Sequence, residues 1–297
     1  MIQDSFKSKP FDTSIKSAPS PKQEPGRIPK QYVIDSLGYG SNFVTFLCSI
    51  FDRYTLESPT IIQLMKDYYL GCTKSGSVIF WQLDGERRVR TGKIMQYTKE
   101  TGKRVKDGPG IDWVHSKLKK EKVLPEGFNL DQCLFGEHLL RRYPNREVAL
   151  TESEKSALIG AGAFPEYVWL ATGGRSQLSI DKAKVLKGRT IQLFPDTDTD
   201  GKTFALWCEK ARELEAIGCR VSVSRMLEDG ATPEEKEAKI DLADWLIPQL
   251  RNAPPPPKVY PNPLPPEEKA VQVLTKHHPE IKALMDELDL QETEKRA

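Results

Sequence analysis

The sequence lacks the cysteine pairs that build a zinc ribbon or a disulfide framework. Its five cysteines are scattered, odd in number and never spaced as CxxC, so neither structure is expected. No apolar run approaches the roughly 20 residues that span a membrane. The N-terminus holds no apolar core of a secretory signal. We therefore expect no bound zinc, no membrane partner and a location in the reducing cytoplasm.

The chain also lacks a strong net charge, but its charges are unevenly distributed. Lys and Arg number 44 against 42 Asp and Glu, a net charge of +2. The segment from Arg87 to Lys122 contains twelve basic and four acidic residues, so its net charge is +8 and that of the rest of the chain is −6. A basic segment beside acidic clusters suits an enzyme that acts on a polyanion. A solvated charged face is the simpler interpretation of the basic runs alone.

The clearest chemical signal is the stretch Thr190–Gly201, TIQLFPDTDTDG. An apolar run leads into three aspartates at alternate positions, Asp196, Asp198 and Asp200, and a glycine closes the stretch. Clustered carboxylates repel one another, so they are stable in solvent or around a hard cation such as Mg²⁺. A solvated acidic turn is the alternative, because Asp and Gly are common turn residues.

Two known site types have a similar pattern of alternate aspartates, but this stretch matches neither of them well. An EF-hand loop requires a glutamate at its twelfth position, where this chain has Trp207, and an apolar strand precedes the acids instead of a helix. A haloacid-dehalogenase-like phosphatase opens with DxDx(T/V), and here Asp200 occupies the Thr/Val place. A third type of site needs a separate glutamate at the end of an earlier strand, and Glu152 meets that requirement.

The 297 residues are enough for about two domains. The first part predicts helices over 41–51 and from Ser58-Pro59 to Gly71, followed by strands over 77–83 and 89–97 joined at Asp84-Gly85, a hairpin signal. We interpret Trp81 as a core residue. For Trp113, core packing is the favoured interpretation and stacking on a base is the alternative.

From Arg146 the pattern alternates between strand and helix. Strands are predicted over 147–150, 167–171, 190–194 and 220–224, and helices over 153–160, 180–186, 203–217 and 241–250. This order favours an α/β fold with a mostly parallel, Rossmann-like sheet and helices on both faces. In such sheets the site lies beyond the carboxyl ends of the strands, where Glu152, Thr172–Gly174 and Asp196–Asp200 all fall.

The domain prediction has four parts. Residues 1–30 are rich in Ser, Pro and Lys and are expected to form a disordered lead-in. Residues 31–145 form a small basic α+β subdomain, and 146–250 form the parallel-sheet domain. Residues 251–297 hold a Pro-rich linker and a charged amphipathic helix. His277-His278 in that helix is interpreted as a solvated helix end, although a pair of histidines can also bind metal.

These motifs resemble a Toprim domain, the fold shared by bacterial DNA primases, topoisomerases and OLD-type nucleases. The resemblance covers about residues 146–250. It includes Glu152 in ALTESEKSAL, the DxD of Asp196 and Asp198 in LFPDTDTDG, and Asp241 in IDLADWL. Ser153 and Ser156 replace the glycine and the aspartate that often follow the glutamate. More loosely, the stretch GSVIFWQLDGERRVRTGKIMQY resembles the basic subdomain of a primase core. The layout is similar to primase-like proteins of Bacteroides-type mobile elements without their zinc ribbon.

The resemblance implies a primase-like nucleotidyltransferase dependent on Mg²⁺ or Mn²⁺. Asp196 and Asp198 would hold the metal with help from Asp200 or Asp241, and Glu152 would be a general base or a further ligand. The implied substrates are single-stranded DNA and nucleoside triphosphates, and the implied partners are a replicative helicase or mobilisation proteins. The residues expected to contact nucleic-acid or nucleotide phosphates are Arg87, Arg88, Arg90, Lys93, Arg104, Lys155, Gly173 and Gly174.

Two other functions stay open at this point. In a Toprim nuclease the same acids would direct a water molecule instead of a 3′-hydroxyl group. In a catalytically degenerate accessory protein the chain would only bind DNA or RNA. A topoisomerase is disfavoured, because no tyrosine-bearing cleavage domain is evident in 297 residues.

Overall fold

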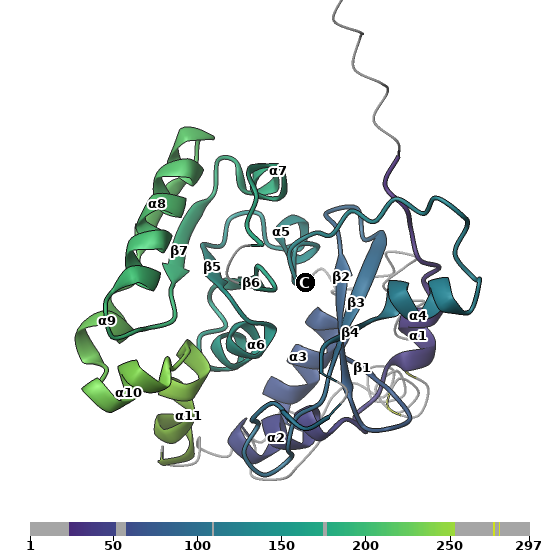
Figure 1. The fold of residues 1–297 in the computed structure, drawn as a ribbon, viewed down its shortest axis with the longest axis horizontal. Helices are drawn as coiled ribbons and strands as arrows, with labels where there is room; N and C mark the ends of the chain where they lie inside the picture. Colours follow the sequence, from purple (N-terminus) through teal and green to yellow (C-terminus); the bar gives the residue numbers. More distant parts are fainter. Residues whose placement is uncertain are drawn as a thin grey trace, which may run out of the picture.

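The computed structural model describes residues 24–51, 58–108, 110–174 and 177–252, together with Lys276 and Pro279. These residues build two four-stranded sheets, one antiparallel and one parallel, which lie side by side with helices around them (Figure 1). The antiparallel sheet comes first in the chain. Most of the predicted lead-in, the Pro-rich linker and the C-terminal helix, including His277-His278, lie outside the described residues.

The antiparallel sheet has the strand order β1-β2-β3-β4. Its strands are β1 (Gly71–Cys72), β2 (Val78–Leu83), β3 (Val89–Met95) and β4 (Asp112–Trp113). The accompanying helices are α1 (Gln31–Ser36), α2 (Asn42–Phe51), α3 (Pro59–Tyr68), α4 (Val114–Lys120) and α5 (Leu139–Arg142).

The β2–β3 hairpin shows how local chemistry shapes this sheet. The Asp84 carboxylate accepts hydrogen bonds from the backbone N–H groups of Glu86 and Arg88, at 2.9 Å each, and thereby closes the turn. Arg87 within it has a positive φ of 60°. The pairing then shifts register between Gln82 and Leu83, an irregularity of the kind that re-aims side chains.

The parallel sheet has the strand order β6-β5-β7-β8, and all three of its pairings are parallel. Its strands are β5 (Val148–Thr151), β6 (Val168–Ala171), β7 (Thr190–Phe194) and β8 (Arg220–Val223). The helices are α6 (Glu154–Ala163), α7 (Ile180–Ala183) with the 3₁₀ turn η1 (Lys184–Leu186), α8 (Lys202–Ala216), α9 (Met226–Gly230), α10 (Pro233–Ala238) and α11 (Leu242–Asn252).

Helices cover both faces of the parallel sheet. The crossover β5–α6–β6 runs in the opposite direction along the sheet from the crossover β7–α8–β8. Because such connections are right-handed, α6 and α8 lie on opposite faces. Helix α11 packs against α6, and α7 packs against α8. The predicted α/β architecture is therefore confirmed.

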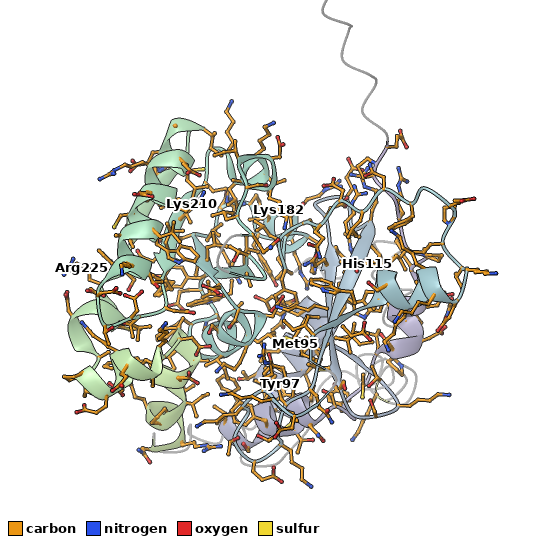
Figure 2. The ribbon with its side chains drawn as sticks, in the orientation of Figure 1. Met95, Tyr97, His115, Lys182, Lys210 and Arg225 are labelled. Atoms are coloured by element: carbon orange, nitrogen blue, oxygen red, sulfur yellow. The ribbon has the colours of Figure 1, made fainter. Side chains whose placement is uncertain are left out.

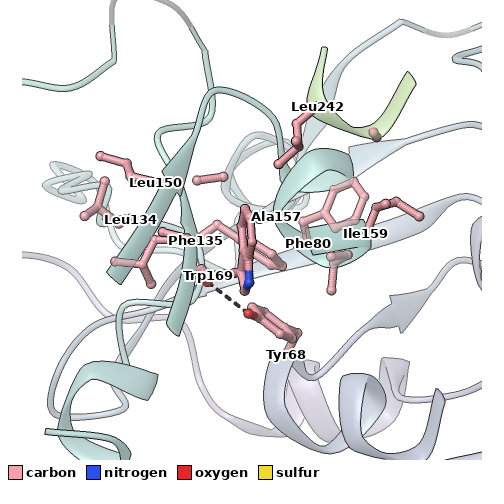
Figure 3. Packing of buried hydrophobic residues seen from close by; sticks show 14 of the residues in the cluster. Tyr68, Phe80, Leu134, Phe135, Leu150, Ala157, Ile159, Trp169 and Leu242 are labelled. Atoms are coloured by element: carbon pink, nitrogen blue, oxygen red, sulfur yellow. Dashed lines mark hydrogen bonds between the residues drawn. The ribbon is translucent and has the colours of Figure 1, made fainter. Parts of the chain in front are cut away.

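One hydrophobic core joins the two sheets. Phe80 on β2 and Phe135 meet edge to face at 5.7 Å between ring centroids, and Trp169 on β6 lies in the same buried cluster (Figure 3). The Tyr68 hydroxyl at the end of α3 donates a 2.9 Å hydrogen bond to the carbonyl of Trp169. Because this cluster includes residues of both sheets, the two parts pack as one body.

A second, smaller cluster covers the other face of the antiparallel sheet. Trp81 is 1% exposed in it, as predicted, and its indole N–H donates to the Ser36 hydroxyl at 2.9 Å. Ile28 also belongs to this cluster and pairs antiparallel with Val89. The predicted disordered lead-in of residues 1–30 therefore extended too far, because burial of Ile28 fixes the chain before residue 30.

Helices and strands were predicted best where caps and periodicity agree. The Ser58 hydroxyl accepts from the backbone N–H of Ile61 and starts α3 at Pro59, and Ser153 caps α6 in the same way through Ser156. Strand β7 has the predicted bounds. The short elements α1, β1, β4, α4, α5, α9 and α10 were not predicted. In the described part of the chain, no helix has the length and apolarity to cross a membrane.

Trp169 tests how far the shared core stabilises the fold. It is 1% exposed, and its ring lies 5.1 Å from that of Phe194. Trp169→Ala should lower the free energy of unfolding by about 3–5 kcal/mol, the cost typical of an aromatic truncation in a packed core. Denaturant unfolding would measure this, with the half-exposed Val185→Ala as a control that should stay within about 0.5 kcal/mol of wild type. A loss below about 1 kcal/mol would contradict the packing.

Candidate active site

The carboxyl ends of three parallel strands bring predicted site residues to one edge of the sheet. Strand β5 pairs in register with both β6 and β7. Glu152 directly follows β5, Thr172 directly follows β6, and Asp196 lies two residues beyond β7. Segments far apart in the sequence are therefore neighbours at this edge, as the sequence predicted.

Asp196 is the most perturbed acid at this edge. Burial raises the pKa of its carboxyl well above the ordinary value of 3.8, and the nearby charges of Asp241 and Glu152 raise it further. Lys155 acts in the opposite direction. Glu152 and Asp241, which belong to other segments of the chain, thus act electrostatically on Asp196. We call Glu152, Asp196, Asp198 and Asp241 the acidic site.

Lys155 on α6 is the cation beside these acids. Its ammonium nitrogen lies 3.2 Å from an Asp241 carboxylate oxygen and 2.8 Å from one of Asp244. Burial alone would lower the pKa of Lys155, but the two aspartates raise it above its ordinary value. The residue predicted to contact phosphate is therefore held by acids of the same chain, and Asp244 joins the neighbourhood without having been predicted as a site residue.

The remaining aspartates of the DTDTD stretch have different surroundings. Asp198 is 6% exposed, and its Oδ2 accepts hydrogen bonds from the N–H (2.8 Å) and the hydroxyl (2.5 Å) of Thr203 in the first turn of α8. A carboxylate is favourable there, because it satisfies free N–H groups at a helix start. Asp200 is exposed and pairs with Lys202.

The oxygen donors of the acidic site suit a hard divalent cation. The raised pKa of Asp196 is an electrostatic strain that a cation between Asp196, Glu152 and Asp241 would relieve. Among the residues that the structure describes, no group of three or more His, Cys, Asp or Glu side chains is arranged so that it could hold a metal ion. The acidic site therefore supplies oxygen donors of the type that Mg²⁺ prefers, without a preformed metal site.

The predicted glycine turn lies beside the acidic site. Gly173 has a φ of 85°, a conformation that favours glycine. Its backbone N–H donates to the carbonyl of Glu152 at 3.0 Å, which fixes the turn against the end of β5. The carbonyl of Gly173 accepts a 3.1 Å hydrogen bond from the Lys93 ammonium group of β3. The turn is therefore held from both sheets.

Lys93 also forms a buried ion pair across the boundary between the sheets. Its ammonium nitrogen lies 2.9 Å from Glu154 Oε2, and the two side chains are 7% and 2% exposed. Sequence analysis predicted Lys93 as a phosphate contact and did not identify Glu154. A polar residue in the first turn of α6 gave no signal that it would face the other sheet.

Two of the four predicted arginines, Arg88 and Arg90, pair with acids of the hairpin. Arg90 is buried and lies 2.7 Å from Asp84, and Arg88 contacts Asp84 at 2.8 Å and Glu86 at 2.6 Å. Arg87 donates a hydrogen bond to the Tyr69 hydroxyl. Arg104 is exposed and pairs through its backbone with Tyr97. The charge of Arg90 is thus used within the fold, whereas Arg87, Arg88 and Arg104 keep solvent access.

Glu137 connects this hairpin to the segment before α5. Its carboxylate accepts from the backbone N–H of Gly85 at 3.1 Å and from that of Leu134 at 3.2 Å. It is 4% exposed, and burial is the main reason why its pKa rises from 4.5 to about 7. The basic hairpin is therefore tied to the segment before α5 by a carboxyl that titrates near neutrality.

A cleft of about 470 Å³ lies between the antiparallel sheet and the glycine turn. We call it the interdomain cleft. Trp113 lines it and is partly exposed, so the favoured prediction of a core position was wrong. Trp113 ends the two-residue strand β4 at the edge of the antiparallel sheet, and such an edge position leaves its side chain half-buried. Its lining includes Gln82, Lys93, Trp113, His115, Thr172 and Gly173.

A family model described as a domain of unknown function, DUF6371, matches residues 41–197. The chain belongs to this family. The DUF6371 match includes both sheets as far as β7, and with them Glu152, the glycine turn and Asp196. It ends before Asp198 and Asp241. A search of the curated proteins finds no match.

Solved structures of bacterial primases are similar to the chain at a low level. The zinc-binding and RNA polymerase domains of Aquifex aeolicus primase are 14% identical, with a TM-score of 0.40 over 71% of this chain and 60% of that one. A DNA primase domain from Pseudomonas aeruginosa is 14% identical, with a TM-score of 0.37 over 74% and 64%. The DnaG primase catalytic domain bound to ssDNA is 14% identical, with a TM-score of 0.38 over 70% and 83%. At these values the likeness carries no conclusion about activity.

The Lys93–Glu154 pair can be tested by a double-mutant cycle. Lys93→Met leaves the Glu154 carboxylate buried without its cation and should cost about 3–5 kcal/mol of unfolding free energy. Adding Glu154→Gln removes the uncompensated charge, so the double variant should recover part of that loss. Urea unfolding of the four proteins measures the coupling. Additive losses would show that the two side chains do not interact.

Glu137 predicts a pH dependence of stability. Its folded-state pKa of about 7 lies above the ordinary 4.5, so the folded state holds this proton more tightly than the unfolded state does. Its contribution to stability is present below pH 4.5 and is lost as the pH rises through 7. The unfolding free energy of Glu137→Gln minus that of wild type should increase by roughly 3 kcal/mol between pH 4 and 8.

The difference between the two proteins isolates Glu137. Burial lowers the pKa of His138 to about 4, which has the opposite effect on stability, but His138 is present in both proteins and cancels. Chemical unfolding at several pH values measures the difference. A difference that stays constant with pH would contradict the assignment.

Proposed function

We propose that this chain is a Toprim-type, Mg²⁺- or Mn²⁺-dependent nucleotidyltransferase. It would make or extend a primer on single-stranded DNA from nucleoside triphosphates. The observation that carries the proposal is that Glu152 and Asp241 lie close to Asp196 beyond the end of β7, where burial first and these two charges next raise the pKa of Asp196. Perturbed acids at this position of an α/β sheet are typical of a catalytic site.

The residues of the acidic site divide the work in this proposal. The metal would be held by Asp196, Glu152 and Asp241, with Asp198 as a further acid of the site. A bound divalent ion neutralises triphosphate charge and favours in-line attack on a phosphorus atom. In the alternative role Glu152 would accept a proton from an attacking hydroxyl group, and both roles for it are retained. The Asp198 contacts to Thr203 orient this carboxylate from the start of α8.

The remaining predicted residues would position the substrates. The positive φ of Gly173 and the bond from its N–H to the Glu152 carbonyl hold the glycine turn beside the acidic site, where its backbone would face the substrate. Arg87, Arg88 and Arg104 would contact the nucleic-acid backbone from the antiparallel sheet. Lys155 would exchange one of its aspartate partners for a phosphate, because its charge is retained there. Partnership with a replicative helicase or with mobilisation proteins of a mobile element remains a prediction from the Toprim resemblance.

A second candidate is a binding module without catalysis. It is favoured by the engagement of Lys155 with Asp241 and Asp244, which already places a cation beside the acids. In this alternative the chain would bind DNA or RNA through its basic residues. The two candidates differ in whether the acids are needed for any reaction.

Primer synthesis decides between them. The full chain is incubated with single-stranded DNA, labelled nucleoside triphosphates and Mg²⁺ or Mn²⁺. Asp196→Asn should lower product formation by about 100-fold or more, the scale seen when an electrostatic catalytic group is removed. The double variant Asp196→Asn/Asp198→Asn extends the test, with thermal unfolding to show that the start of α8 is intact.

Asp229→Asn is the matched control, because Asp229 is an exposed acid paired with Arg225. It should leave product formation unchanged. Primer made equally well by Asp196→Asn would refute the assignment. Cleaved template without primer would identify a nuclease, and bound template without either reaction would identify the binding module.

A further inference from the structure

The interdomain cleft is separate from the acidic site but adjoins it. Gln82, Lys93, Trp113 and His115 reach it from the antiparallel sheet and α4, and Thr172 and Gly173 reach it from the parallel sheet. None of the acids of the acidic site lines it. The connection is Gly173, whose N–H is bonded to the Glu152 carbonyl. A ligand could therefore occupy both places at once.

Gln82 has an acceptor without a donor. It is 2% exposed, and its Oε1 accepts no hydrogen bond from any part of the chain that the structure describes. The other residues of β2 are apolar. Burying an amide oxygen without a partner costs about 1–3 kcal/mol, so this position costs stability unless a ligand supplies an N–H group. Its amide also carries donors, a combination that matches the edge of a nucleobase.

Two aromatic side chains line the same cleft. The ring centroids of Trp113 and His115 lie 5.7 Å apart at an interplanar angle of 41°. His115 lies beside the antiparallel sheet (Figure 2). Its Nδ1 is 2.8 Å from the Thr91 hydroxyl, and this hydrogen bond fixes the ring. Burial and the nearby Lys119 lower the pKa of His115, which favours the neutral ring. Trp113 thus offers a partly exposed π-face beside a neutral ring.

The charged residues at the cleft make phosphate an unfavourable ligand. Its cationic lining residue, Lys93, is already paired with Glu154 at 2.9 Å and bonded to the Gly173 carbonyl. An anion would have to compete with that buried carboxylate. A flat, uncharged ring with an N–H donor fits the lining without this cost.

We propose that the interdomain cleft is a nucleobase-binding subsite, in which Trp113 stacks on the base and the Gln82 amide forms a hydrogen bond with it. This proposal rests on the proposed function and adds a base-binding site to it. Because Gly173 lines the cleft and its N–H is bonded to the Glu152 carbonyl, the base would lie next to the acidic site. The base belongs either to a nucleoside triphosphate or to the DNA template, and both share the chemistry that the cleft recognises.

Equilibrium binding without metal tests the subsite in the full chain. The variants are Trp113→Leu, which removes the π-face, and Gln82→Leu, which removes the amide at similar volume. The probes are ATP, inorganic tripolyphosphate and a short single-stranded oligodeoxynucleotide, measured by calorimetry in EDTA. Each variant should weaken binding of ATP, of the oligonucleotide or of both by about tenfold, the scale of one lost stacking contact, and should leave tripolyphosphate binding unchanged.

Stability separates a ligand role from a packing role for Gln82. Because its Oε1 has no partner, Gln82→Leu should unfold at the same or a higher denaturant concentration than wild type while it loses binding. Trp245→Leu, a partly buried tryptophan on α11, is the matched control and should bind both base-containing probes normally. Loss of only ATP binding assigns the incoming nucleotide, and loss of only oligonucleotide binding assigns a template base.

Normal binding of both probes by Trp113→Leu and Gln82→Leu would overturn the subsite, as would the absence of binding by the wild-type chain. This failure is distinguishable from failure of the proposed function. If Asp196→Asn abolishes primer synthesis but both cleft variants bind normally, only the subsite is wrong. If the cleft variants lose base binding but Asp196→Asn still makes primer, the subsite stands and the catalytic assignment fails.

Discussion

The buried ion pair between Lys93 and Glu154 is the constraint on which the arrangement of the two sheets depends. Its nitrogen and oxygen lie 2.9 Å apart with almost no solvent access, so separating the sheets would leave two charges buried or force both into water. The same ammonium group holds the carbonyl of Gly173. One side chain thus sets the position of α6 and of the glycine turn relative to β3.

Two acids of the acidic site, Asp198 and Asp241, also accept hydrogen bonds at helix starts. Asp198 accepts from the first turn of α8, and at the start of α11 the carboxylates of Asp241 and Asp244 each accept a hydrogen bond from the other residue's backbone N–H. A carboxylate at a helix start is stabilised by free N–H groups. Asp196 has no such support in the electrostatics of the site and has the raised pKa. A strongly raised pKa at the carboxyl edge of the sheet is typical of functional sites.

The DUF6371 match gives a family context for this geometry. It runs from residue 41 to 197 and so contains the antiparallel sheet, the interdomain cleft and the first acid after β7. The family unit therefore crosses the boundary predicted at residue 146. The shared core explains why, since Phe80, Phe135 and Trp169 pack in one cluster and neither sheet buries its face alone.

The sequence by itself determined the parallel sheet, its helices and the three strand ends, because alternating periodicity and helix caps are local and the site of such a sheet lies at its carboxyl edge. It also determined that Glu152 and Asp196 would meet there. Only the tertiary structure decided the partners of the charged residues: Lys93 with Glu154, Lys155 with Asp241, and Arg90 with Asp84. Pairing between distant segments depends on how the two sheets pack, and no local pattern encodes it. The exposure of Trp113 and the lone acceptor of Gln82 were decided in the same way, by what lies across the cleft.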